Sequence, residues 1–151
     1  MSAVPKVVTA SREIAAPSEV IFELIADPSQ QPRWDGNDNL GEADPGQRIR
    51  CVGDVFTMVL AQGSVRENHV VEFEEGHRIA WLPAEVGAKP PGHRWRWEVQ
   101  SLGAALSKVT HSYDWSNLAD ESRFERARTT TSERLRLSLD RLANVAESPP
   151  R

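Results

Sequence analysis

A histidine and a tyrosine two positions apart, His111 and Tyr113, are the residues of this chain best suited to act on a small molecule. In an extended strand this spacing places both side chains on one face, together with Trp115. An imidazole and a phenol that face one cavity could serve as acid and base on an enolisable carbonyl or a hydroxyl leaving group. The same pair could instead orient a ligand by hydrogen bonds, or be core residues satisfied by backbone groups.

Other charged and polar groups could support this pair. His69 and Glu67 share a face of another predicted strand, so His69 is a candidate ligand-binding residue. A carboxylate beside a histidine raises its basicity and fixes its tautomer. Arg128, further along the chain, could meet a carboxylate or phenolate of a ligand. The plainer expectation is that Glu67 lies in solvent and that the Arg128 guanidinium extends to the surface.

Tryptophan is frequent in this chain, with five residues against one tyrosine and four phenylalanines. Trp81, Trp95 and Trp97 fall on predicted strands and could form a flat wall for a planar or polycyclic ligand. The alternative is that they fill the core. We expect this more of Trp97 than of Trp95, because Trp95 follows a Pro/Gly-rich loop.

The order of the elements that would position these residues indicates a curved sheet around a helix. A strand is expected over 6–14, and Pro17 opens an amphipathic helix over 17–26 that is followed by a short helix over 28–34. A turn-rich loop covers 35–46. Alternation with a period of two then predicts six further strands, over 47–52, 54–61, 65–74, 77–83, 93–101 and 106–115.

A long C-terminal helix is expected over 122–146, where Ser122 and the glutamate three residues later form a capping-box signature. Its apolar stripe includes Leu135, but polar Thr131 and Arg128 fall on or beside it. A fully packed helix seldom turns that many polar groups inward. Thr131 and Leu135 therefore join the candidate ligand-binding residues, on a helix that lines a partly polar cavity.

Composition limits the class of protein. The length predicts a single domain over 1–151, with short tails over 1–5 and 148–151. The net charge of -4 argues against a nucleic-acid partner. We find no apolar run near the ~20 residues of a membrane span. Cys51 is the single cysteine, which fits a reducing, cytoplasmic setting.

Motifs for metal or cofactor chemistry are missing. The four histidines lack the H-x-H or H-E-x-x-H spacing of metal ligands. The sequence also lacks a Gly-rich phosphate loop and a G-x-S-x-G nucleophile motif. Asp35, Asn37 and Asn39 are spaced as at the start of a calcium loop, but Leu40 stands where that loop needs glycine. We therefore expect neither a metal nor a cofactor.

The N-terminal part of the chain carries the pattern of a known family. The motif I-x-A-P-x-x-V-[FW]-x-x-[IL]-x-D-P followed by a tryptophan is met by Ile14, Ala16, Pro17, Val20, Ile21, Phe22, Ile25, Asp27, Pro28 and Trp34. Gly53 before a strand and the R-I-A-W pattern at 78–81 add to it. By these residues and their order, the chain resembles the START/polyketide-cyclase superfamily (SRPBCC) over about residues 6–146.

This resemblance implies an α+β helix-grip fold, in which a seven-stranded antiparallel sheet in the order β-α-α-β6-α wraps around a long C-terminal helix beside an internal pocket. It implies binding of a small hydrophobic metabolite, aromatic or polycyclic. The alternative is a cofactor-independent polyketide cyclase or dehydratase with His111 and Tyr113 as the acid/base pair. Members of the family differ in function, so the motif residues indicate the fold rather than the chemistry. A homodimer and a protein-interaction role stay open.

Overall fold

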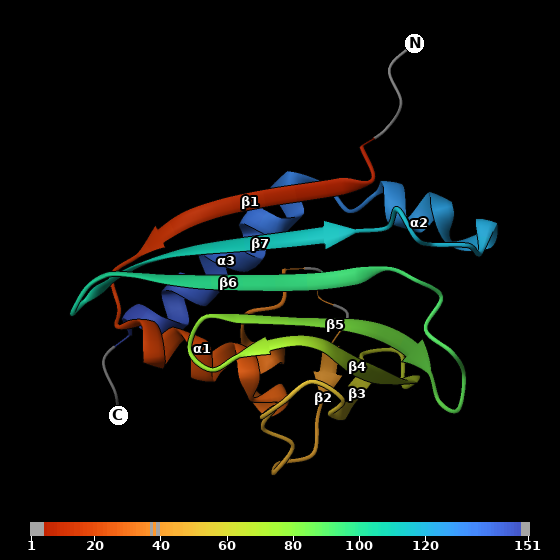
Figure 1. The fold of residues 1–151 in the computed structure, drawn as a ribbon, viewed down its shortest axis with the longest axis horizontal. Helices are drawn as coiled ribbons and strands as arrows, with labels where there is room; N and C mark the ends of the chain where they lie inside the picture. Colours follow the sequence, from red (N-terminus) through yellow and green to blue (C-terminus); the bar gives the residue numbers. More distant parts are fainter. Residues whose placement is uncertain (1–4, 37, 39, 149–151) are drawn as a thin grey trace.

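One antiparallel sheet of seven strands organises the protein, in the order β1-β7-β6-β5-β4-β3-β2 (Figure 1). The computed structural model describes residues 5–36, 38 and 40–148. The strands are β1 (Val7–Ile14), β2 (Leu40–Glu42), β3 (Val55–Leu60), β4 (Val65–Glu74), β5 (Arg78–Glu85), β6 (Arg94–Gly103) and β7 (Leu106–Asp114). The helices are α1 (Ser18–Ala26), the 3-10 helices η1 (Pro28–Arg33) and η2 (Glu121–Arg123), α2 (Phe124–Arg128) and α3 (Ser132–Glu147). This arrangement confirms the predicted helix-grip fold.

Parts of three predicted segments lie outside the described residues. They are most of the N-terminal tail, most of the C-terminal tail, and the calcium-like spacing at Asn37 and Asn39.

Local sequence sets the ends of the first two helices. Pro17 is extended, with φ -61° and ψ 145°, and directly precedes α1. Asp27 ends α1 and caps η1, because its carboxylate accepts hydrogen bonds from the Ser29 backbone N–H (3.1 Å) and hydroxyl (2.8 Å). The buried face of α1 consists of Ile21, Phe22, Ile25 and Ala26. In Figure 1, α1 and α2 lie at opposite ends of the sheet.

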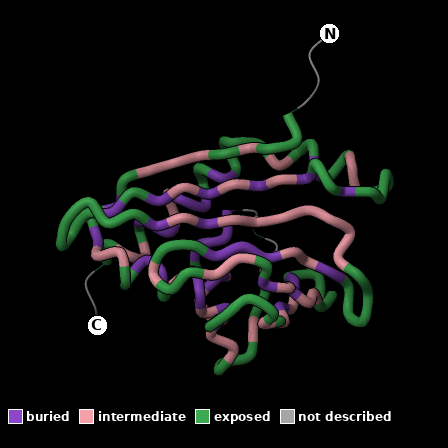
Figure 2. Tube along the Cα trace, in the orientation of Figure 1, coloured by how far each residue is buried: buried purple, intermediate pink, exposed green. Residues whose placement is uncertain are grey.

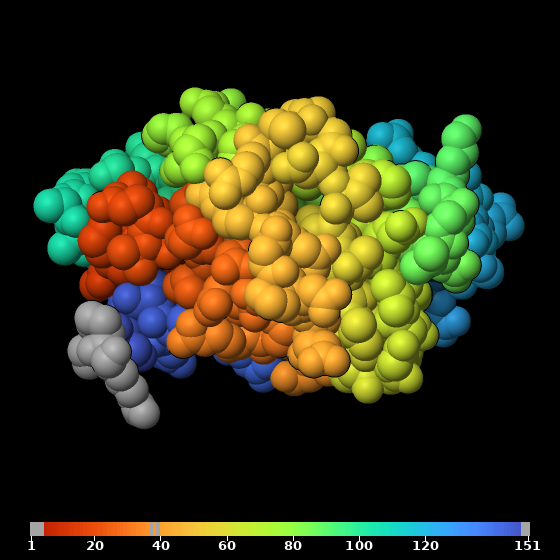
Figure 3. Space-filling model, turned by 90° about the horizontal axis from the view of Figure 1, so that it is seen from below, coloured from red at the N-terminus to blue at the C-terminus, as the bar shows by residue number. Residues whose placement is uncertain are grey.

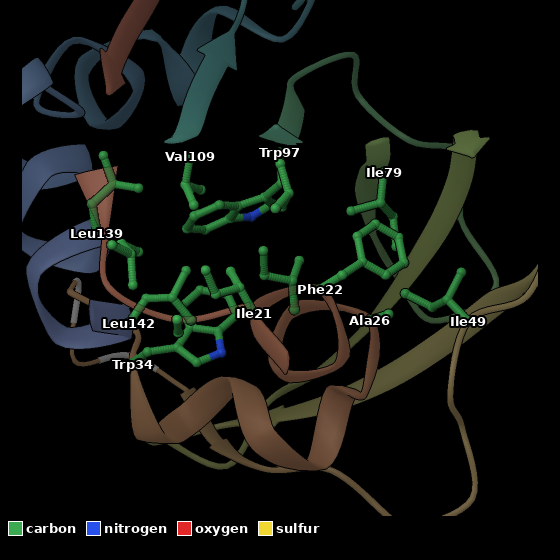
Figure 4. Packing of buried hydrophobic residues seen from close by; sticks show 14 of the residues in the cluster. Ile21, Phe22, Ala26, Trp34, Ile49, Ile79, Trp97, Val109, Leu139 and Leu142 are labelled. Atoms are coloured by element: carbon green, nitrogen blue, oxygen red, sulfur yellow. The ribbon is translucent and has the colours of Figure 1, made fainter. Parts of the chain in front are cut away.

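The main core lies where α1 and α3 pack on the inner face of the sheet (Figure 4). Trp97 meets Trp34 edge to face, with ring centroids 5.0 Å apart. A second cluster lies toward α2 and consists of Tyr113, Trp115, Leu118, Ala127 and Leu135. Burial is concentrated on the middle strands and on the helices that face them, whereas the strand ends and turns are exposed (Figure 2). From below, the chain from α1 to β3 forms most of the visible surface (Figure 3).

Residues 47–52 are irregular, so the strand predicted there is wrong, and the second strand is instead β2, inside the predicted loop. Side chains satisfy backbone groups where strand pairing was expected. The Gln47 amide accepts a hydrogen bond from the Thr57 N–H (2.8 Å) and donates one to the Thr57 carbonyl oxygen (3.1 Å). The Asp54 carboxylate accepts hydrogen bonds from two N–H groups of the same irregular segment. These local bonds compete with a β ladder.

The long helix begins at Ser132 and not, as predicted, at Ser122. Asp120 caps the earlier turn, where its carboxylate accepts a hydrogen bond from the Ser122 N–H (3.0 Å). The chain then breaks at 129–131, a run of three threonines, which are poor helix formers. Thr131 becomes the N-cap of α3 through its hydroxyl. Within the described residues, no helix is long and apolar enough to cross a membrane.

Candidate functional site

A cavity of about 230 Å³ lies between the inner face of the sheet and the helical segments opposite. Strands β3 to β7 line one side, and η1, α2 and the first turns of α3 line the other. Thr129 and Thr130 also line it, so the break between α2 and α3 borders the cavity. Ligand pockets commonly measure about 300–1,000 Å³, so this cavity suits a compact molecule better than a sterol.

Strand register brings the aromatic residues together on the cavity side. Trp95 in β6 pairs with Trp81 in β5 and with Tyr113 in β7, and Trp97 pairs with His111. Side chains opposite one another on a shared face lie close enough to interact. The ring centroids of Trp95 and Tyr113 are 4.4 Å apart. All five residues line the cavity, so the aromatic residues and the His111–Tyr113 pair share one site.

The His111 imidazole is buried and neutral. Its Nδ1 lies 3.0 Å from the Arg96 carbonyl oxygen. Because a carbonyl only accepts, Nδ1 carries the proton and Nε2 keeps a lone pair. The ring stacks on Trp97 with centroids 3.6 Å apart, and on Trp95 with centroids 5.5 Å apart. Burial lowers the pKa of His111 to about 3, against a smaller opposing effect of the hydrogen bond to Arg96.

Tyr113 and His93 are also held in their neutral forms. Burial raises the pKa of Tyr113 to about 12, although the charges of Arg126 and Arg123 act in the opposite direction. Burial, and then the charges of Arg123, Arg126 and Arg66, lower the pKa of His93 to about 4. The His93 and Tyr113 ring centroids are 6.0 Å apart. Near neutral pH this end of the cavity therefore combines neutral rings with positive guanidinium groups.

The central polar groups suit hydrogen bonding better than proton transfer. A general base works best when its pKa lies near the operating pH. The pKa values of about 3 for His111 and about 12 for Tyr113 lie far from neutrality on both sides. Trp97 adds a donor, since its buried indole N–H has no hydrogen-bond partner among the described residues. In the same part of the chain, no three His, Cys, Asp or Glu side chains are placed to hold a metal ion.

His69 does not line the cavity, although the sequence assigned it to the ligand site. Its neighbour Asn68 is the buried, cavity-lining residue of β4. A β-bulge at 70–72 shifts the alternation, so Phe73 packs on the core although it has the parity of His69. The Glu67 carboxylate accepts a hydrogen bond (2.8 Å) from a backbone N–H in the loop after β5. Neither His69 nor Glu67 is therefore part of the cavity lining.

Arg128, Thr131 and Leu135 are also outside the cavity lining. Arg128 ends α2 with an exposed side chain, and Thr131 is exposed as the cap of α3. Leu135 is buried in the second hydrophobic cluster. One continuous helix would have aligned these residues on a single stripe, and the break at 129–131 changes that alignment.

Sequence reasoning missed a different face of the same segment. This face of residues 123–134 lines the cavity with Arg123, Arg126, Ala127, Thr130 and Arg134. These residues recur at intervals of three and four, which is the pattern of one helical face and was a readable signal. The apolar stripe predicted from the sequence was defined by residues such as Leu135, so it did not include the arginines of this face. Asn68, Gln31 and Ser138 supply further polar lining that no motif marked.

The fold and the cavity together define a helix-grip protein with an internal aromatic site. The chain belongs to the family described as "Polyketide cyclase / dehydrase and lipid transport", which it matches over residues 5–147. This match confirms the resemblance to the START/polyketide-cyclase superfamily.

Similar proteins extend this assignment without naming a ligand. The uncharacterized protein Rv0088 of Mycobacterium tuberculosis (strain ATCC 25618 / H37Rv) is 28% identical over 114 residues, covering 74% of this chain and 48% of the relative. The chain thus spans about half the length of the curated relatives it matches. A START superfamily protein from Mycobacterium smegmatis has a TM-score of 0.64 at 15% identity, covering 93% of this chain and 97% of the other. The di-domain ARO/CYC StfQ from the steffimycin biosynthetic pathway has a TM-score of 0.61 at 20% identity, covering 93% and 44%.

Proposed function

We propose that this protein binds a small aromatic metabolite in the cavity between sheet and helices. The observation that carries the proposal is the wall of Trp81, Trp95 and Trp97 along a cavity of about 230 Å³. Flat aromatic side chains favour flat ligands, and a few polar groups beside them fix the orientation. The family description, which includes lipid transport, supports a binding role.

The two central polar residues give the proposed ligand its orientation. Nε2 of His111 accepts a hydrogen bond, since Nδ1 is engaged by the Arg96 carbonyl. Tyr113 stays protonated near neutral pH because its pKa is raised to about 12, so its hydroxyl donates. A ligand with a hydroxyl or N–H group at one position and a carbonyl at another would satisfy both residues.

The alternative is a cofactor-independent cyclase or dehydratase that acts on a polyketide-like substrate. The family description supports it, as it names cyclases and dehydrases. The strongly shifted pKa values of His111 and Tyr113 weigh against it, because such groups exchange protons poorly near neutral pH. In a screen of polyketide-like substrates, turnover that is lost in His111→Gln and Tyr113→Phe at unchanged affinity would favour the enzyme. Changed affinity without turnover would favour the binding protein.

Trp95 is the residue at which to test the binding role. The matched variants are Trp95→Leu, which removes the flat ring, and Trp95→Phe, which keeps one. Native mass spectrometry of the purified protein would first detect any retained ligand, and calorimetric titration with naphthamide, a flavonoid, a fatty acid and a sterol would follow. We expect saturable binding of the fused-ring aromatic compounds. Affinity should fall by roughly 3- to 10-fold in Trp95→Leu and by less in Trp95→Phe, since an aromatic pair contributes about 0.5–1.5 kcal/mol.

Two results would contradict the proposal. One is that no ligand class binds and no ligand mass is retained. The other is that Trp95→Leu and Trp95→Phe bind aromatic compounds as well as the unmodified protein does, because the ring at Trp95 would then contribute nothing.

The cellular location and the oligomeric state of the protein are expectations. A cytoplasmic location suits a carrier or sensor of a metabolite, and the single cysteine supports it. A homodimer remains a prediction, and the same native mass spectra would read the oligomeric state directly.

A further inference from the structure

One end of the cavity is rich in arginine. Arg66 from β4, Arg123 from η2 and Arg126 from α2 all line it. The positive charge of each of the three lowers the pKa of His93, which lines the same cavity. Arg123 and Arg126 also act on Tyr113. The three cations therefore line one cavity together with His93 and Tyr113 and add positive charge to it.

Negative charge inside this part of the cavity is scarce. Among the described lining residues the acidic side chain is Asp35, which follows η1, whereas Arg134 adds a fourth arginine. Arg123 pairs with Glu85 (3.4 Å) and with Asp120, but these carboxylates are 63% and 48% exposed. Solvent therefore screens these two carboxylates, and they neutralise the charge of Arg123 only weakly.

Arg66 has hydrogen-bond donors that are not used by a carboxylate. Within the described residues its guanidinium contacts the carbonyl oxygen of its neighbour Val65, at a long 3.4 Å, and not a carboxylate. A guanidinium carries five N–H donors in a planar fork that fits a carboxylate. Several of these donors are therefore free for an acceptor that enters the cavity.

From these positions we infer that the ligand is an aromatic carboxylate, with its rings against Trp95 and its carboxylate toward Arg66, Arg123 and Arg126. This inference rests on the proposed binding function and specifies the class of ligand. An anion in this position relieves the mutual repulsion of three cations and forms charge-assisted hydrogen bonds with them. The neutral His93 adds a hydrogen-bonding group among them without adding charge.

The aromatic wall and the volume separate this ligand from other anions. A fatty acid would place a flexible chain against rings that favour a flat body, and a sterol exceeds a compact cavity of about 230 Å³. A free inorganic anion would leave the tryptophan wall unused. An aromatic ring system with one carboxylate uses both ends of the site.

The test compares naphthoate with naphthamide, which have the same rings and nearly the same shape but differ in charge. Calorimetric titration of the full chain near neutral pH should show naphthoate binding about tenfold more tightly. The difference should shrink when the ionic strength is raised to about 0.5 M. Arg66→Gln and Arg126→Gln should each weaken naphthoate binding by several-fold and naphthamide binding by less, so that the preference for naphthoate falls.

Arg128→Gln is the matched control. Arg128 lies two positions after Arg126 on the same short helix, is exposed, and does not line the cavity. Its removal changes the net charge equally, so a site-specific role for Arg126 requires that Arg128→Gln keep the full preference for naphthoate. If Arg126→Gln in α2 lowers the melting temperature, Arg66→Gln in β4 still tests the preference for naphthoate independently.

The outcomes separate this inference from the function on which it rests. Equal affinity for naphthoate and naphthamide overturns the carboxylate while leaving an aromatic site intact. An equal loss in Arg126→Gln and Arg128→Gln reduces the effect to long-range attraction and also overturns it. If neither compound binds, the proposed function fails as well.

Discussion

Burial decides the charge of the residues at the centre of the cavity. His111 is 3% exposed and stacks with two tryptophans, and burial alone accounts for the lowering of its pKa. A buried imidazole that stays neutral has one N–H donor and one nitrogen acceptor, and each needs a hydrogen-bond partner. The Arg96 carbonyl uses the donor. The acceptor Nε2 is the part of the ring that remains for a ligand.

His111 also links stability to pH. Its pKa is about 3 in the folded chain against an ordinary value of 6.5, so below pH 6.5 the unfolded chain binds a proton that the folded chain does not. Stability from this group is complete above pH 6.5 and is lost as the pH falls toward 3. Between pH about 7.5 and about 5, we expect His111 alone to account for a loss of about 2 kcal/mol in the free energy of unfolding. Urea unfolding of His111→Gln should lack this part of the loss.

His77 provides the comparison. It is an exposed histidine in the turn between β4 and β5. His77→Gln removes a histidine from the surface instead of the core and is the matched control for the substitution itself. If His111→Gln and the unmodified protein lose the same free energy between the two pH values, the buried neutral imidazole is excluded as the cause.

Among the elements, the break between α2 and α3 shapes the cavity most. The break separates α2 from α3, and α2 and the break line the cavity with Arg126, Ala127, Thr129 and Thr130. The new start of α3 depends on Thr131, whose hydroxyl accepts a hydrogen bond from the Arg134 N–H (3.3 Å). The cap therefore supports an element that also presents Arg134 and Ser138 to the cavity.

Removing this cap should weaken α3. We expect Thr131→Ala to lower the free energy of unfolding by about 1 kcal/mol, because an N-terminal N–H loses its acceptor. Thr131→Ser keeps a capping hydroxyl and should stay close to the unmodified protein. Urea unfolding at neutral pH would measure both variants, and an equal loss in Thr131→Ala and Thr131→Ser would show that the hydroxyl is not what matters.

Element types followed from the sequence where one face of an element is buried and its pattern is regular. The aromatic alternation of β6 and the amphipathic α1 are examples. The errors arose where a local contact overrides the pattern. The Gln47 and Asp54 side chains satisfy backbone groups where strand pairing was expected, and the bulge at 70–72 places Phe73 on the core although it has the parity of His69. Neither a side-chain substitute for pairing nor a bulge leaves a periodic trace in sequence.

The residues of the site that could be predicted also lie on regular elements. His111, Tyr113 and the three tryptophans lie on regular strands, so the period of two brings them to one face. Arg123 ends η2 and Arg126 lies on α2, and the break at 129–131 separates both short helices from α3. Their spacing of three and four residues indicates one helical face, but it does not tell which face of the segment lines the cavity.

Across the whole molecule, the two hydrophobic clusters differ in how they hold the helices. α3 buries Leu135, Ser138, Leu139, Leu142 and Ala143. The five-residue α2 buries Ala127, with Phe124 packed beside it on the second cluster. An element with little buried surface opens locally at lower free energy than the core. The arginine-bearing border of the cavity is therefore its least firmly held part.

Hydrogen exchange should show this difference. We expect amides over 119–130 to exchange faster than those of α3 in the free protein, because fewer buried contacts resist their opening. Naphthoate should slow exchange over 119–130, since it would contact Arg123 and Arg126, and should leave β1 unchanged. Equal protection of α2 and α3 in the free protein would contradict the proposed ranking. The β1 peptides are the internal reference for a general stabilisation by ligand.

The Gln47 amide matters for how the molecule behaves in a crowded solution. An unpaired strand edge is a template on which another chain can add a strand. At Thr57 in β3, beyond the pairing with β2, the Gln47 side chain occupies both the N–H and the carbonyl oxygen. A single side chain thus occupies backbone groups at the edge of the sheet to which a strand of another molecule could otherwise bind. The sheet can stay open and curved around its cavity without exposing that stretch to its neighbours.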